Sequence, residues 1–249
     1  MAKPVKKFLF RPDSQCPCGS GKGIASCHLD VDGRLRKPAP SLNPPGPPTG
    51  YSHAGCYLRG TADCSEQISR EHYISRSVLD QLGQFIRVSG APWQKPGEQL
   101  ETSIGNLTAK ILCKRHNEAL SPLDDEAASF FSTLAKALVD LDRKTLSRKP
   151  IFHLTSGDAL ELWVLKVACG LYFSVGAKDR VKLTDSHTID LQLAQRAFFM
   201  REWEPRAGLY FHGTTGSRIT VANSVAISPL TDDQKLGSGP IKIPMSANM

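Results

Sequence analysis

The sequence predicts an α+β protein built from a small zinc module, a linker and a larger core with a mainly helical C-terminal support. Three observations lead to this prediction. Cysteines and histidines gather in two groups, one before residue 29 and one between residues 53 and 117. A proline-rich run separates the two groups. Strand-like alternation around the second group gives way to apolar residues at helical spacing further along the chain.

The length and composition fit a soluble protein. A chain of 249 residues can bury a sizeable core as one large domain or as a medium domain with an appendage. No apolar run reaches the roughly 18 residues of a membrane span. The first seven residues carry charge but no apolar segment follows them, as a signal peptide would require. We therefore expect a cytoplasmic location and no membrane partner.

The net charge of +7 is concentrated near the N-terminus, where residues 1–60 hold nine Lys or Arg against three Asp, which is +6 of the +7. A basic arm of this kind suits a polyanion such as nucleic acid or the ribosome. Such arms are also common as solubilising tails, so charge alone does not decide. Seven cysteines without a signal peptide favour metal ligands or free thiols over disulfides.

The first Cys/His group occupies residues 16–28. It offers the thiols of Cys16, Cys18 and Cys27 and the imidazole of His28 around a glycine-rich turn. Four such ligands are what tetrahedral zinc requires, and a segment this short has no core of its own. The Cys-Pro-Cys-Gly-Ser-Gly run and the Cys-His pair resemble the SEC-C motif. That resemblance implies a zinc site in residues 1–37 and a partner bound through the module, either nucleic acid or protein.

Residues 38–50 contain six prolines and form the linker. Such a run makes neither helix nor sheet interior and acts as a semi-rigid spacer. The predicted units are therefore residues 1–37, 38–50, 51–121 and 122–249.

The second Cys/His group suits another zinc ion, because ligands separated in sequence can meet in the fold. Cys113 and His116 form one natural pair of ligands. Their partners are either Cys56 with Cys64 or Cys56 with His53, which has the tighter spacing. We favour the two thiols, since soft ligands dominate structural zinc sites. The group therefore predicts a zinc ion held by Cys56, Cys64, Cys113 and His116.

Groups suited to hydrolysis lie beside this predicted zinc. Glu71 and His72 open a segment that can continue as a strand through residues 73–74, and residues 107–112 alternate enough for a second strand. Residues 114–120 then predict a short helix. The order is strand, strand, helix around one metal.

The order Glu-His, Asn-Leu, Leu-Cys-x2-His-Asn resembles the HNH endonucleases, the ββα-metal nucleases. The resemblance implies that Glu71 and Asn117 bind a catalytic divalent ion, Mg²⁺ or Mn²⁺, and that His72 is the general base. It also implies that Asn106 holds the His72 loop, and that the substrate is DNA. The chemistry is coherent, since an imidazole and a hard cation can activate water and stabilise the phosphoryl charge.

Several departures from that family are visible. The proline usually found two positions beyond the Ile is absent, and the gap from His72 to Asn106 is long enough for an insertion that includes a helical segment at 77–83. His116 could bind either the structural zinc or the catalytic metal. The competing hypothesis is a zinc-stabilised adaptor without catalysis, which binds nucleic acid or the ribosome.

The C-terminal half predicts support for this core. Ser121 and Pro122 are typical of a helix start, followed by acids at the positive end of the helix dipole and apolar spacing through residue 141. Residues 156–175 predict a largely apolar and therefore central helix, and residues 189–200 a third helix. Residues 208–222 predict a β-hairpin, and the chain after Leu230 is expected to be loosely ordered.

Overall fold

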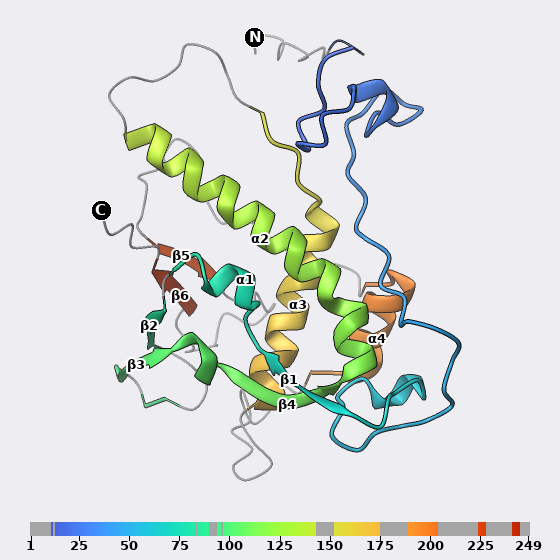
Figure 1. The fold of residues 1–249 in the computed structure, drawn as a ribbon, viewed down its shortest axis with the longest axis vertical. Helices are drawn as coiled ribbons and strands as arrows, with labels where there is room; N and C mark the ends of the chain where they lie inside the picture. The colour runs from blue at the N-terminus through green and yellow to red at the C-terminus, as the bar shows by residue number, and fades with distance from the viewer. Residues whose placement is uncertain are drawn as a thin grey trace, which may run out of the picture.

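The computed structural model describes residues 11, 13–82, 84–89, 94–95, 97–142, 152–174, 189–203, 224–227 and 241–244. Within these residues the fold is mixed α/β, with small two-stranded antiparallel sheets and four α-helices (Figure 1). The strands are β1 (Ile68–His72), β2 (Phe85–Ser89), β3 (Gln99–Ser103), β4 (Thr108–Cys113), β5 (Ser224–Ile227) and β6 (Ile241–Pro244). The helices are α1 (Arg76–Leu79), α2 (Lys114–Asp142), α3 (Gly157–Ser174) and α4 (Leu191–Met200), with 3-10 turns at Ile24–Ser26, Arg59–Thr61 and Ile104–Asn106.

The predicted strand, strand and helix are present as β1, β4 and α2. The two strands are antiparallel, with Ile68 opposite Cys113 and His72 opposite Thr108. The backbone N–H of Tyr73 then donates to the carbonyl of Leu107, and α1 begins at Arg76. Our expectation that Glu71 and His72 open a strand through residues 73–74 is wrong, because β1 ends at His72. The Glu-His pair therefore closes its strand.

Helix α2 is continuous over 29 residues, so the predicted break at Ser121 and Pro122 is also wrong. Pro122 has no N–H and leaves the carbonyl of Glu118 without its helical donor. The hydroxyl of Ser121 donates to that carbonyl at 2.9 Å. Because this bond satisfies the exposed group, the helix passes through the proline, and Asp124 lies well inside α2.

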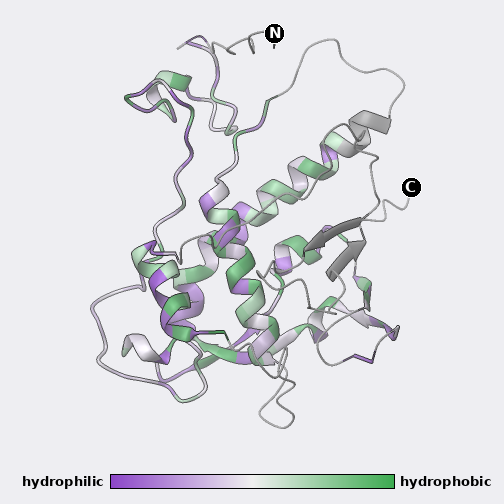
Figure 2. Cartoon of the chain, turned by 180° about the vertical axis from the view of Figure 1, so that it is seen from behind, coloured by the Kyte–Doolittle hydropathy of each residue, from purple (hydrophilic) through white to green (hydrophobic). Residues whose placement is uncertain are grey.

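The central predicted helix is confirmed as α3, which Figure 2 shows to be largely hydrophobic. Its buried side chains include Leu162, Trp163 and Val167, which join one core with side chains from β4, α2 and α4. Gly170 lies so close to the chain after β1 that a Cβ on it would come within 2.8 Å of the Tyr73 Cβ. The prediction for residues 189–200 is confirmed by α4, which Asp190 caps through its side chain.

The insertion between β1 and β4 contains more structure than we expected. Helix α1 is shorter than the predicted segment at 77–83, and β2 pairs with β3 in an antiparallel hairpin that the sequence did not suggest. The hairpin predicted over 208–222 lies outside the described residues. Beyond it, β5 pairs with β6, so part of the chain expected to be loose is a strand. None of the described helices combines the length and apolar character that crossing a membrane requires.

The proline-rich segment lies along the core. The side chain of Leu42 is 3% exposed and belongs to the core cluster. The carbonyl of Pro40 accepts a hydrogen bond from Arg201, and just before the segment Lys37 pairs with Glu126 on α2 at 2.7 Å. The spacer interpretation needs revision for this reason, since residues 37–46 are held against the helices. The division of the chain into four units stays a prediction.

Candidate metal centres and active site

The first Cys/His group comes together around two tight turns. The ligand atoms of Cys16, Cys18, Cys27 and His28 all lie within 4.8 Å of one another, with His28 Nδ1 3.3 Å from Cys16 Sγ and 3.2 Å from Cys27 Sγ. Gly19 adopts a φ of 82°, a conformation that lets the chain reverse between the two pairs of ligands. Three thiols and one imidazole at this separation could hold a zinc ion.

The thiols of this cluster differ in acidity. Burial raises the pKa of Cys16 to about 11, and neighbouring thiols add to the rise. Burial also acts on Cys18, but hydrogen bonds from Ser20 outweigh it and lower the pKa of Cys18 to about 6. Because thiolate is the form that binds metal, Cys18 is ready to bind at neutral pH while Cys16 must release its proton as the metal binds.

The second group forms a fully buried cluster at the junction of β4 and α2. The ligand atoms of Cys56, Cys64, Cys113 and His116 lie within 4.8 Å of one another. From His116 Nδ1 the distances to the three Sγ atoms are 3.5 Å, 3.7 Å and 3.2 Å in that order. Of the two open alternatives the structure brings in Cys64, whereas His53 Nδ1 accepts a hydrogen bond from the Gly55 N–H. This cluster, too, could hold zinc.

A hydroxyl behind His116 determines which ring nitrogen faces the thiols. The Thr61 hydroxyl donates to the Leu58 carbonyl, so its oxygen can accept from His116 Nε2, 3.0 Å away. The lone pair of His116 is then on Nδ1, which faces the thiols. Burial lowers the pKa of His116 to about 4, so the imidazole is neutral at pH 7. These features fit a metal ligand, and they place His116 with the structural cluster.

Glu71 lies in a separate buried polar site, where β1 meets α2 and α3. Its side chain is 10% exposed and pairs with Lys166 Nζ at 2.7 Å. Asn117 on α2 also donates a side-chain hydrogen bond to Glu71, so these two predicted residues are in contact. Burial raises the pKa of Glu71, although Lys166 acts in the opposite direction.

Lys166 joins Glu71 to a second carboxylate that the sequence analysis did not select. Its ammonium lies 2.6 Å from Asp124 Oδ2 on α2. The other oxygen of Asp124 accepts a hydrogen bond from the Ser75 hydroxyl, and Trp163 Nε1 donates to Ser75 Oγ at 2.6 Å. The available signal was a lysine in the middle of an apolar segment, since buried lysines need partners.

His72 ends β1 beside this site. Among the described residues, its Nε2 is buried and has no hydrogen-bond partner. Burial lowers the pKa of His72, and Arg76 lowers it further. The lowered pKa favours the neutral ring at pH 7.

Asn106 lies apart from these groups, in the 3-10 turn before β4. Its side chain is exposed and donates to Thr102 Oγ1 at 3.1 Å. The contact between this region and the chain after His72 is the backbone bond from Tyr73 to Leu107. The role of Asn106 in holding the His72 loop stays a prediction.

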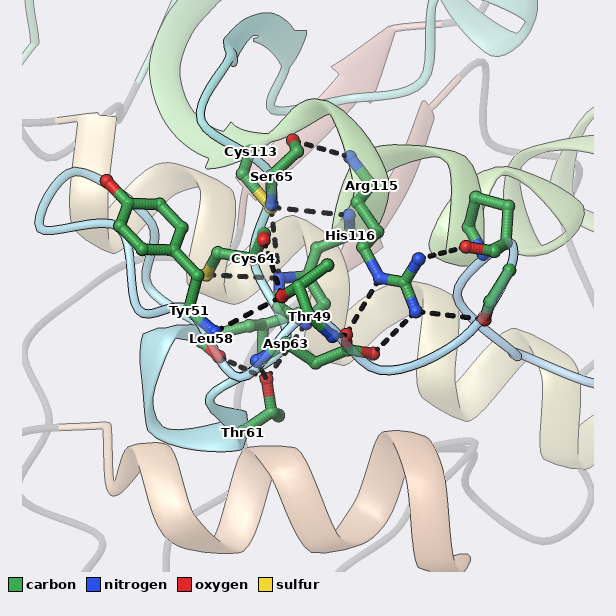
Figure 3. A network of polar contacts seen from close by, with 12 residues as sticks. Thr49, Tyr51, Leu58, Thr61, Asp63, Cys64, Ser65, Cys113, Arg115 and His116 are labelled. Carbon is green, nitrogen blue, oxygen red and sulfur yellow. Dashed lines mark hydrogen bonds and ion pairs between the residues drawn. The ribbon is translucent and has the colours of Figure 1, made fainter.

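Arg115 anchors the proline-rich segment next to the second cluster (Figure 3). Its guanidinium donates to the carbonyls of Pro45 and Gly46 and to Asp63 Oδ2 at 3.0 Å. Nε also lies 2.9 Å from Asp63 Oδ1 as an ion pair, although its N–H is not directed for a hydrogen bond. Burial acts to raise the pKa of Asp63, but the bonds from Arg115 and Thr49 outweigh it and lower that pKa.

The fold and clusters define a mixed α/β protein with two candidate zinc centres. No protein-family model, curated protein or solved structure matches the chain. The likeness to HNH endonucleases and to the SEC-C motif therefore depends on the residues quoted above.

Proposed function

We propose that this chain is a metal-dependent endonuclease that hydrolyses DNA phosphodiester bonds, with His72 as the general base. The observation that carries the proposal is the contact between Glu71 and Asn117 beside His72. Glu71 and His72 lie on β1 and Asn117 lies on α2, and the buried Cys/His cluster stands where β4, the partner strand of β1, leads into α2. The same order of strand, strand and helix is what the HNH resemblance implies.

The donor groups near Glu71 suit Mg²⁺ or Mn²⁺. Glu71 and Asp124 supply carboxylate oxygens and Asn117 supplies an amide, and hard divalent ions prefer such ligands. When bound, the ion stabilises negative charge on the phosphoryl oxygens. His72 Nε2 takes a proton from the attacking water, and the lowered pKa of His72 keeps it in the neutral form that this step needs. The basic N-terminal arm and the first Cys/His cluster supply contacts to nucleic acid or to a protein partner.

A second candidate is the adaptor without catalysis. It is favoured by one observation, namely that Lys166 already pairs with both carboxylates of the site. An adaptor would use the two clusters for stability and bind nucleic acid or the ribosome through its N-terminal module. It would tolerate alanine at Glu71, His72 and Asn117.

The test is cleavage of supercoiled plasmid with Mg²⁺ or Mn²⁺ by wild-type protein, His72→Ala and His153→Ala. His153 is an exposed histidine before α3 and serves as the matched control. We expect wild type and His153→Ala to nick the plasmid and His72→Ala to lose about 10²–10⁴-fold in rate, the usual contribution of a general base. Zinc content, measured by elemental analysis, should be equal in all three proteins. If none of the three cuts while zinc is bound, the adaptor hypothesis takes precedence.

A further inference from the structure

Lys166 occupies the position between the two carboxylates that a cation would take. Its Nζ lies 2.7 Å from Glu71 Oε1 and 2.6 Å from Asp124 Oδ2, and its side chain is 5% exposed. Both oxygens of Asp124 are engaged, one by Lys166 and the other by Ser75. The two carboxylates are therefore already paired with a positive charge, the Lys166 ammonium of α3.

The position of Lys166 follows from how α3 packs. Gly170 is four residues further on and lies on the same helix face, where its missing side chain allows α3 to approach Tyr73 closely. That approach brings the ammonium to Glu71, which lies two residues before Tyr73. The side chain of Lys166 is almost completely buried, and among the described residues its ammonium pairs with Glu71 and Asp124.

The ammonium stays charged in this position. Burial alone would lower the pKa of Lys166, but Asp124 and Glu71 outweigh it and raise that pKa. Two carboxyl groups face this one ammonium, so one negative charge is left over when both are ionised. Mg²⁺ binds carboxylate oxygens at a distance of about 2.0–2.1 Å. An ammonium within hydrogen-bonding distance of the same oxygens would repel the bound ion at close range in a buried site, which disfavours binding of both together.

We propose that the Lys166 ammonium and the divalent ion compete for Glu71 and Asp124, so that the ion binds only when Lys166 leaves the pair. Lys166 thus acts as an internal competitor that weakens metal binding at this site. The inference deepens the proposed function and rests on it for the identity of the ion. The competition is measured by metal binding alone, without DNA.

The experiment is a Mn²⁺ titration of zinc-loaded, full-length protein, followed by the electron paramagnetic resonance signal of free Mn²⁺. Lys166→Met removes the charge and keeps an apolar stem of similar length. Lys136→Met makes the same change at an exposed lysine on α2 and controls for the loss of one general charge. We expect Lys166→Met to bind Mn²⁺ at least about tenfold more tightly than wild type, which corresponds to about 1.4 kcal/mol. Lys136→Met should resemble wild type.

A double variant locates the site. Lys166→Met with Glu71→Gln should lose the gained Mn²⁺ affinity, because the carboxylate at residue 71 is then absent. The proposal is overturned if Lys166→Met binds Mn²⁺ no more tightly than wild type, or if the gain survives Glu71→Gln.

Wild-type protein provides a second measurement in case Lys166→Met does not fold. Lysine acetylation is measured by peptide mass spectrometry. Lys166 should be protected from acetylation without divalent ion, and its acetylation should increase as Mg²⁺ is added. Unchanged protection at the highest Mg²⁺ concentration contradicts the competition.

The two proposals fail in distinguishable ways. If Lys166→Met gains the Mn²⁺ site and no variant cuts plasmid, the competition holds and the nuclease proposal fails. If wild type cuts plasmid and Lys166→Met shows no tighter binding, the reverse is true.

Discussion

Two nearby residues of opposite charge, Arg76 and Asp80, act on the pKa of His72 in opposite directions. Burial is the main cause of its lowered pKa, Arg76 adds to the effect, and Asp80 opposes it. Arg76 and Asp80 pair with each other across one turn of α1 at 3.6 Å, and both side chains are exposed. Asp124 and Lys166 of the site act on the pKa of His72 as well, so two surface residues contribute to it without belonging to the site.

This arrangement predicts opposite shifts in the pH dependence of cleavage. Because the pKa of His72 lies below its ordinary value of 6.5, kcat/KM should stay high as pH falls to that value and decline only below it. Arg76→Ala should move the decline to higher pH, and Asp80→Asn should move it to lower pH. Both shifts should shrink at high salt, since exposed charges are screened.

The measurement is the pH profile of plasmid nicking by wild type and the two variants. A decline above pH 6.5 in wild type, or shifts of the same sign in both variants, would contradict His72 as the group that titrates.

Helix α2 supplies three residues of the candidate sites from one continuous element. His116 faces the Cys/His cluster, whereas Asn117 and Asp124 are seven residues apart, two turns along the helix, and so share a face. That face meets Glu71 and Lys166. A helix that began at Ser121 and Pro122 would have Asp124 in its first turn, where an acid is expected to interact with the helix dipole. The continuous helix instead places Asp124 two turns after Asn117.

The Cys/His clusters should differ in what they stabilise. Cys113 is the last residue of β4 and belongs to the core cluster. Cys113→Ser should therefore lower the free energy of unfolding of the whole core by more than about 4 kcal/mol, a loss typical of a removed metal site. Cys16→Ser should change the core transition by less than about 1 kcal/mol, because its cluster forms from residues 16–28 alone.

Zinc analysis and urea denaturation of both variants provide the check. Wild type should contain about two zinc ions, as two tetrahedral sites require, and each variant about one. Equal destabilisation by the two substitutions would show that the clusters are not independent.

At the scale of the whole molecule, one buried arginine joins three distant segments. Arg115 on α2 connects Pro45 and Gly46 of the proline-rich segment with Asp63 near the second cluster (Figure 3). The segment then continues to Leu42, which is buried in the core. The proline-rich run is thus part of the packed structure.

Arg115→Ala should destabilise the protein by about 3–5 kcal/mol, because it leaves a partly buried Asp63 without its cation and frees the proline-rich segment. Lys114→Ala is the matched control, since Lys114 precedes Arg115 and, among the described residues, its side chain forms an exposed pair with Glu118 at 3.9 Å. That control should change stability by less than about 0.5 kcal/mol. Urea denaturation of both proteins decides, and similar effects from the two substitutions would argue against the role of Arg115.

The predictable part of the molecule is local. Cysteine and histidine are recognised as metal ligands by residue type, and α3 and α4 are indicated by apolar residues at helical spacing. Both could therefore be predicted. Lys166 could not be assigned to Glu71, because their contact depends on how α3 packs against the chain after β1. At Pro122 the Ser121 hydroxyl bonds the Glu118 carbonyl, and Arg115 bonds the carbonyls of the proline-rich segment. These features involve tertiary contacts, which the spacing of apolar residues in the sequence does not predict.

The two clusters also differ in how much chain must exist before each can close. The first needs only the stretch from Cys16 to His28, whereas Cys56 and His116 of the second are 60 positions apart. Once residue 28 of the nascent chain has emerged from the ribosome, every ligand of the first cluster is available. The second cluster becomes possible only after the start of α2 has emerged, because His116 lies there. The two sets of ligands therefore become complete in a fixed order during synthesis, first that of the module and then that of the core.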